Sequence, residues 1–307
     1  MDHVSFFWLK PENNKIVKGL ESEFYALVKD AIRHNRLILP PIPEVLAKLL
    51  ELCKHEETSV HDVADLLLDD PSITALIIKT SNTVIFNRRN VICHDIFTAV
   101  SRLGIFRVRD IVAAYTVQEL KNNANFSLEC NNILKHSAQN SRQLAATMAV
   151  IASRLPNQSH QKNKLEVDKC LLAGLLADIG LFGLIHEYQA YLDSGNYLDL
   201  DIAKYIFENC CDKSSETVLK HWGFDEDFLA VATNTKQHSY PENHNSQYLD
   251  AARMASHLLM YRNDDADIDT HEIELDLYAA ELMYELTNIS DSEFNGLTKE
   301  AMKNSGL

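Results

Sequence analysis

The chain has 307 residues, of which 46% are hydrophobic and 24% charged, so it can bury one large core or two smaller ones. Its 29 Lys and Arg stand against 44 Asp and Glu, which gives a net charge of −15. A surface this acidic repels phosphate backbones and anionic lipids. Nucleic acid and membranes are therefore excluded as general partners.

The sequence predicts a cytoplasmic protein of bacterial type with reduced thiols. Its six cysteines contain no C-x-x-C pair, and its first residues lack a basic segment followed by a long apolar core. No uninterrupted apolar run approaches the roughly 20 residues that a membrane-spanning helix needs.

Helices should dominate the fold. Only 9 Gly and 7 Pro occur in the whole chain, and apolar residues recur at spacings of three and four. Residues 1–36 are predicted to be a helical extension that packs on the main body, because Leu20, Phe24, Val28 and Ile32 fall near one helical face. The class predicted is all-α.

Residues 37–125 are predicted to form a first helical lobe. After the extended, proline-rich opening 39–43, helices are expected near 43–53, 59–67, 70–82, 95–103 and 105–120. Ser59, Asp70 and Asp95 each occupy an expected N-cap, and Pro71 suits a first helical position. Gly104 should separate the last two helices.

Residues 126–262 are predicted to form a second helical lobe, followed by an acidic helical segment over 263–307. Long helices are expected near 130–155 and 166–184, and shorter ones near 200–209, 212–222, 225–237, 246–262 and 272–288. Gly174, Gly180 and Gly183 would let the second long helix approach its neighbours closely, or end it near Gly180 or Gly183.

Motifs in the first lobe resemble the HDOD domain, a bacterial regulatory relative of the HD phosphohydrolases. The resemblance is carried by LPPIPEVLAKLLEL, DVADLLLDDPSITALIIKTSNTVIF and AVSRLGIFRVRDIVAA. Within them, Asp70-Pro71, Ser81-Asn82 and Arg102-Leu103-Gly104 stand in the family's order. It covers about residues 37–240 and implies a two-lobed, all-helical fold with an HD-like second lobe.

The resemblance also locates the positions at which HD enzymes bind metal. His136 matches the first histidine and Asp178 the aspartate of the paired motif, but Ala177 replaces the histidine of that pair. The next histidine position falls on Cys211, the late aspartate position on Ser256, and a distal histidine position on His238. These six residues are interpreted as remnants of a metal site.

Too few ligands remain for phosphate chemistry. A hard divalent ion needs several oxygen or imidazole ligands, and His136 with Asp178 supplies only two. We therefore predict no metal, no cofactor and no catalytic residue, as the resemblance also implies. The simpler role for His136 and Asp178 is a buried imidazole–carboxylate contact between two helices. His238 and His244 are interpreted as residues of a solvated loop.

Four arginines, Arg88, Arg89, Arg107 and Arg109, are the remaining candidate binding residues. The turn at Gly104 superficially resembles a DNA-binding helix-turn-helix, but the acidic total argues against that reading. The arginines are predicted either to form salt bridges with acidic helices or to line a groove between the lobes that holds a small acidic ligand.

The sequence thus predicts a non-enzymatic signal-transduction module that acts by binding a protein partner or a ligand in that groove. The alternative is a metal-dependent phosphohydrolase of nucleotides or cyclic dinucleotides, with ligands recruited from His136, Asp178, Cys211 and His238. A third reading is an acidic scaffold that is bound through residues 1–36.

Overall fold

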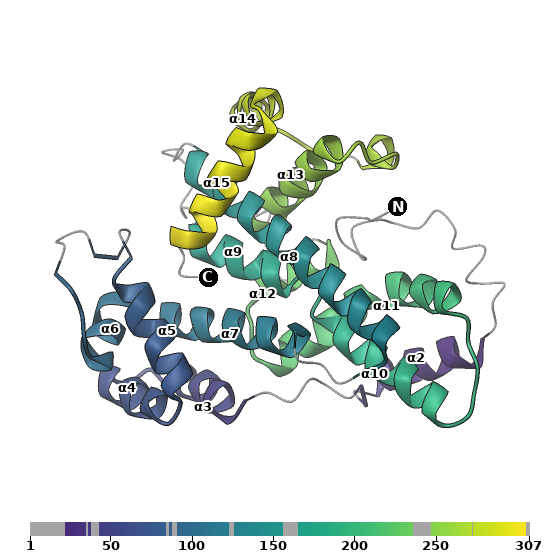
Figure 1. Cartoon of the computed structure of the whole chain (residues 1–307), viewed down its shortest axis with the longest axis horizontal. Helices are drawn as coiled ribbons and strands as arrows, with labels where there is room; N and C mark the ends of the chain where they lie inside the picture. The colour runs from purple at the N-terminus through teal and green to yellow at the C-terminus, as the bar shows by residue number, and fades with distance from the viewer. Residues whose placement is uncertain are drawn as a thin grey trace. The chain divides into compact units, whose positions relative to one another are not determined.

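The structure is a computed structural model, and it describes residues 22–34, 36–37, 43–83, 86–87, 91–122, 126–155, 165–235, 247–271 and 273–304. Over these residues every regular element is a helix, which confirms the all-α prediction (Figure 1). The chain divides into two compact units. Unit 1 comprises Met1–Pro40 and Leu120–Ile289, and unit 2 comprises Pro41–Glu119 and Ser290–Leu307.

Unit 2 contains a series of short helices whose ends follow the capping signals in the sequence. They are α3 (Glu44–Leu52), α4 (Val60–Leu68), α5 (Pro71–Ser81), α6 (Ile96–Leu103), most of α7 (Ile105–Asn122), and α15 (Asp291–Asn304). Ser59 and Asp62 form a complete capping box, and Asp70 and Asp95 accept backbone N–H groups at their helix starts. Gly104 has φ +84° and ends α6, as predicted.

Unit 1 contains the remaining helices of the part of the chain that the structure describes. They are α2 (Glu23–Arg33), α8 (Leu128–Arg154), α9 (Val167–Leu176), α10 (Gly180–Asp193), α11 (Leu200–His221), α12 (Glu226–Thr233), α13 (Gln247–Arg262), the 3-10 turn η1 (Ile268–Thr270) and α14 (Leu277–Asn288). Helix α8 packs along α9 and α13, and α10 packs along α11. Helix α2 packs on α10 and α11, with the buried Phe24 ring against Tyr188 and Tyr191.

Some predicted helix boundaries differ from those of the structure. The helix expected over 166–184 ends at Leu176 before a turn at Ala177–Ile179, close to the end near Gly180 that the sequence also allowed, and α10 begins at Gly180. The two helices expected near 200–209 and 212–222 are one helix, α11, because buried Cys210 and Cys211 continue its apolar side without a break. The spacing of apolar residues does not predict such helix ends, because they depend on tertiary packing.

One stretch, Val167–Asp193, is long and apolar enough to cross a membrane by length and composition alone. In the structure 89% of its apolar window is buried within the protein. Its two halves, α9 and α10, therefore belong to the core of unit 1, where apolar side chains on all sides of a helix are expected.

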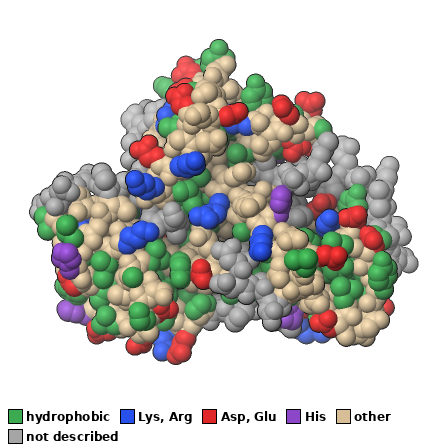
Figure 2. All heavy atoms as spheres, viewed as in Figure 1, with side chains coloured by type: hydrophobic (Ala, Val, Ile, Leu, Met, Phe, Trp, Pro, Cys, Tyr) green, Lys and Arg blue, Asp and Glu red, His purple; other side chains and the backbone are tan. Residues whose placement is uncertain are grey.

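The surface of unit 2 exposes several large apolar side chains. Figure 2 shows apolar side chains over α3, α4 and α6, interspersed with Asp, Glu and His. The exposed large apolar residues of this unit are Leu68, Val91, Ile92, Phe97 and Phe106. The His61 ring stacks on Phe97 at a centroid distance of 4.2 Å, so part of this surface is already covered by the protein itself.

Candidate functional site

Two of the residues predicted to match HD metal positions lie in the turn between α9 and α10. Ala177 and Asp178 lie in this turn and are almost fully buried, with 1% of each residue exposed. The Ser137 hydroxyl of α8 donates a hydrogen bond of 3.4 Å to Asp178 Oδ2. His136, the neighbour of Ser137, is exposed, so its predicted burial is wrong. Its predicted contact with Asp178 stays a prediction.

Two serines of α11 hold the other side of this turn. The Gly180 N–H donates to Ser215 Oγ at 3.0 Å, and Ser214 Oγ donates to the Gly180 carbonyl at 2.7 Å. A Cβ on Gly180 would lie 2.1 Å from the Ser215 nitrogen, so only glycine fits here. Cys211 is fully buried one turn earlier, with Sγ 3.9 Å from Ser215 Oγ. Small hydroxyl side chains thus pack α11 against the turn.

The remaining metal positions complete the comparison with an HD site. Ser256 on α13 is fully buried, and among the described residues its hydroxyl has no hydrogen-bond partner. His238 lies outside the described residues. Across the part of the chain that the structure describes, no three His, Cys, Asp or Glu side chains are grouped so that they could hold a metal ion. The described side chains at these positions, an alanine, a buried thiol, a buried hydroxyl, an exposed imidazole and one carboxylate, therefore do not fit the ligand set of a hydrolytic metal centre.

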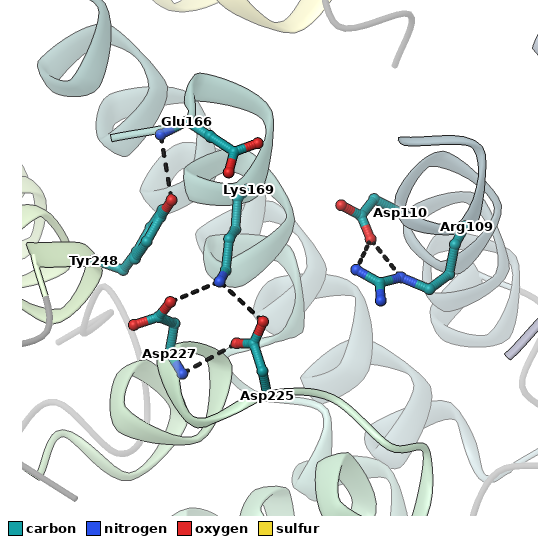
Figure 3. Close-up of polar contacts among 7 residues, drawn as sticks. All are labelled: Arg109, Asp110, Glu166, Lys169, Asp225, Asp227 and Tyr248. Atoms are coloured by element: carbon teal, nitrogen blue, oxygen red, sulfur yellow. Dashed lines mark hydrogen bonds and ion pairs between the residues drawn. The ribbon is translucent and has the colours of Figure 1, made fainter. Parts of the chain in front are cut away.

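The candidate arginines contact residues of their own unit where they are described. Arg109 donates through Nε to Asp110 Oδ1 at 2.8 Å, and the two side chains are only 19% and 13% exposed (Figure 3). The Arg107 guanidinium lies over the Phe86 ring at 5.4 Å. Arg88 and Arg89 lie outside the described residues. The predicted groove between the lobes stays a prediction.

The Ser81-Asn82 and Arg102 motifs form one hydrogen-bonded network in unit 2. Asn82 pairs with the backbone of Cys93 through two hydrogen bonds of 2.7 Å, one in each direction. Arg102 donates to the Ser81 carbonyl at 2.9 Å and to the Val91 carbonyl at 3.0 Å. These motif residues therefore fix the segment before α6 against the end of α5, which is a structural role.

A second polar cluster, which sequence reasoning missed, joins three helices of unit 1 (Figure 3). Lys169 on α9 contacts Asp225 at 2.9 Å and Asp227 at 2.6 Å at the start of α12. Its ammonium also lies 4.7 Å from the Tyr248 ring of α13. Burial lowers the pKa of Lys169, but the hydrogen bonds to Asp227 and Asp225 outweigh it and raise the pKa overall. No short motif joins these positions, which are up to 79 residues apart in sequence.

Comparison with known proteins agrees with this architecture. The model of the HDOD domain matches residues 39–238, which is more than half of the chain. The chain belongs to the HDOD family. The match spans the network around Asn82 and Arg102 as well as the turn at Asp178. No curated protein gives a significant match.

Solved structures share the fold of this HDOD protein at low sequence identity. A putative metal-dependent phosphohydrolase from Shewanella amazonensis SB2B has a TM-score of 0.69 and 20% identity, over 92% of this chain and 97% of that one. An HDOD domain protein from Geobacter sulfurreducens has a TM-score of 0.55 and 16% identity, over 91% and 97%. A putative phosphohydrolase from Shewanella amazonensis SB2B has a TM-score of 0.52 and 16% identity, over 93% and 99%.

Proposed function

We propose that this HDOD protein is a non-enzymatic regulatory module of a bacterial signalling pathway, which acts in the cytoplasm by binding a protein partner or a small ligand. The HD-like lobe then serves as a packed helical scaffold without phosphoester hydrolysis. Catalysis by an HD enzyme depends on metal ions that polarise phosphoryl oxygens and activate water. The proposal therefore depends on whether this chain can hold such ions.

The observation that carries the proposal is the set of side chains around the turn at Asp178. Ser137, Ser214 and Ser215 supply neutral hydroxyls that hydrogen-bond the turn itself. An alanine, a buried cysteine and a buried serine occupy three of the matching metal positions. Neutral hydroxyls are weak ligands for divalent ions, and the thiol prefers softer ions than those of phosphate chemistry.

The alternative function is a metal-dependent phosphohydrolase, as the names of two related structures suggest for those proteins. Their sequence identity to this chain is 20% or less, at which the fold is shared but activity does not follow. This alternative needs His136, Asp178, Cys211 and His238 to gather around an ion. The difference in burial between His136, which is exposed, and Asp178, which is almost fully buried, argues against that arrangement.

The two functions are separated by a hydrolysis assay on the purified full chain. The chain is supplied with Mn²⁺, Mg²⁺, Fe²⁺, Ni²⁺ or Zn²⁺ in turn and tested on nucleotides, cyclic dinucleotides and bis(p-nitrophenyl) phosphate. We expect no turnover above background, and no difference between the wild type, His136→Ala and Asp178→Asn. Metal-dependent hydrolysis that disappears in either variant would establish the enzyme instead.

The binding role itself is tested by reconstitution. A protein retained by the folded full chain from native lysate is identified and then mixed with the chain as a pure component. The proposal expects a complex of fixed stoichiometry, or a small ligand that co-purifies with the chain and rebinds after removal. Absence of both across growth conditions, in a chain shown to be folded by circular dichroism, would count against a regulatory role.

A further inference from the structure

Helix α14 of unit 1 exposes large apolar side chains on the side that faces away from the core. Its buried side packs on α13. On the opposite side lie Leu277, Tyr278 and Tyr284, which are 70%, 49% and 74% exposed. The outer side of a surface helix is normally polar, whereas exposed apolar side chains that gather on one side are typical of a binding surface.

A pocket opens beside these side chains, between α14 and the last residue of α8. Its volume is about 330 Å³, and it is lined by Arg154, Tyr278, Glu281, Leu282 and Glu285. Tyr278 and the buried Leu282 give it apolar walls, and the two glutamates, four residues apart, lie on one side of the helix. This volume is at the lower end of the range of ligand pockets, about 300–1,000 Å³, so the pocket suits one long side chain of a partner.

The charges around the pocket favour a cation. Arg154 forms an ion pair with Glu285, so the lining holds one arginine against two carboxylates. Glu281 has no ion-pair partner among the described residues. Residues 263–298, which include all of α14, contain Asp and Glu but no Lys or Arg. A Lys or Arg from a partner can therefore contact the Glu281 carboxylate and the face of the Tyr278 ring.

Helix α14 is fixed at both ends, so this surface is formed before any partner binds. Asp276 caps its N-terminus by accepting the Ala279 N–H at 2.8 Å. At the other end, Arg262 of α13 donates to the Leu286 carbonyl at 2.6 Å and to the Ile289 carbonyl at 2.9 Å. A surface that is already ordered loses little conformational entropy on binding.

We propose that Leu277, Tyr278, Glu281, Tyr284 and Glu285, which we call the α14 face, dock a basic amphipathic segment of a partner protein. Apolar side chains of the partner cover the exposed leucine and tyrosines, and one Lys or Arg enters the pocket. A second copy of this chain fits less well, because two α14 faces would bring like charges together. The inference rests on the proposed function, because it concerns the protein partner of the regulatory module.

The test selects peptides that bind the full chain from a phage-displayed library of random short peptides, and measures the affinity of the enriched peptides by fluorescence anisotropy. Enriched peptides should combine Lys or Arg with Leu, Phe, Tyr or Trp, and their affinity should fall as the salt concentration rises. Glu281→Lys and Tyr284→Gln should each weaken binding about tenfold, because one reverses a charge and the other removes an aromatic contact.

Two residues outside the α14 face provide matched controls. Glu57→Lys makes the same charge change in an exposed turn of unit 2, and Tyr197→Gln removes a tyrosine that is 84% exposed between α10 and α11. Both variants should bind the peptides as tightly as the wild type, with circular dichroism showing that all four are folded. No enrichment, enrichment of peptides without Lys or Arg, or equal affinity in all variants would overturn the proposed surface.

A partner purified after capture from native lysate separates this inference from the function on which it rests. If that partner binds the wild type, Glu281→Lys and Tyr284→Gln equally well, the surface is wrong but the regulatory function stands. If no protein or ligand binds the wild type, both are wrong. A dimer of the chain that Tyr284→Gln dissociates in analytical ultracentrifugation would show that a second copy covers the α14 face, and would overturn the basic partner.

Discussion

Two carboxylates on α11 are held in partly buried surroundings that disfavour their charge. Burial raises the pKa of both Glu208 and Asp212, which lie one turn apart. Asp212 Oδ1 is buried and has no hydrogen-bond partner among the described residues. A carboxyl whose pKa is raised by folding destabilises the fold when ionised, so the free energy of unfolding falls as pH rises through the folded-state pKa.

Asp212→Asn should therefore stabilise the protein at pH 7. Removing a partly buried, incompletely paired charge is expected to raise the free energy of unfolding by on the order of 1 kcal/mol. The gain should vanish at acidic pH, at which Asp212 is itself neutral. Urea denaturation of both proteins at a series of pH values measures this difference.

Glu216, one turn further along α11, provides a control of opposite sign. Partial burial raises its pKa, but the hydrogen bond from Lys220 and the charge of Lys213 outweigh it and lower the pKa overall. Glu216→Gln should consequently destabilise the chain at pH 7, and the loss should shrink in high salt. If Asp212→Asn instead lowers the free energy of unfolding at pH 7, the ionised Asp212 carboxylate must be well solvated in the folded protein, and the prediction is wrong.

Helix packing in unit 1 depends on two glycines that allow backbones to approach. A Cβ on Gly174 of α9 would lie 2.5 Å from the Ala145 Cα of α8. A Cβ on Gly180 of α10 would lie 2.1 Å from the Ser215 nitrogen of α11. In both cases the nearest atom is backbone, so no side-chain rotation could relieve the clash.

Gly180→Ala should destabilise the protein strongly, because α10 must move away from α11 and the two serine hydrogen bonds to Gly180 are strained. The expected loss is about 3 kcal/mol or more. Gly296→Ala is the matched control: Gly296 is an exposed residue inside α15 with open space around it. It should stabilise the chain by about 0.5–1 kcal/mol through helix propensity.

Thermal denaturation of the two glycine variants, followed by circular dichroism, compares them directly. Opposite shifts in melting temperature are expected, with the larger shift in Gly180→Ala. A Gly180→Ala protein as stable as the wild type would mean that the α10–α11 contact is looser than the hydrogen bonds of Ser214 and Ser215 indicate.

At the scale of the whole molecule, the net negative charge opposes the approach of nucleic acids and other polyanions. The net charge is −15, and Figure 2 shows Asp and Glu side chains scattered over the face that it draws. Non-specific DNA binders owe their affinity to neutralising several phosphates with Lys and Arg. Arg109 already forms an ion pair with Asp110, which further reduces the positive charge available to bind phosphate groups.

The chain should therefore bind duplex DNA more weakly than about 10⁻⁴ M at physiological salt, beyond the usual range of non-specific binders. Fluorescence anisotropy of a labelled duplex at two salt concentrations measures this affinity. The helix-turn-helix reading makes the opposite prediction: tighter, salt-dependent binding that Arg107→Gln weakens. Such a result would support the DNA-binding role against which the acidic composition argues.

Much of the fold could be predicted from local signals. The N-caps Ser59, Asp70 and Asp95 and the stop at Gly104 are decided within one helical turn, and the structure has each of them. The HDOD motifs were recognisable because their residues stay in order along the chain. The break at Ala177–Ile179 stayed one of two alternatives in the sequence, because apolar residues continue through it on both sides while Gly180 allows a helix end nearby.

The candidate site divides in the same way. The predicted replacement of HD metal ligands by Ala177, Cys211 and Ser256 can be read from the chain alone, because it requires only residue identity. The surroundings of Asp178 cannot be predicted from the sequence, because Ser137 lies 41 residues away and contacts Asp178 only through the packing of α8 against the turn. The contact between His257 on α13 and His271 after η1 likewise joins residues of two elements and has no signal in the local sequence.

The amino-acid sequence by itself determined the helical class, the helix caps, the acidic charge and the residue types at the predicted HD metal positions, since each depends on residue type or on neighbours within a turn. Only the tertiary structure decided which hydroxyls hold the turn at Asp178, which acids surround Lys169 and which histidines face each other. These contacts join residues far apart in the chain, and their geometry is set by the collective packing of helices.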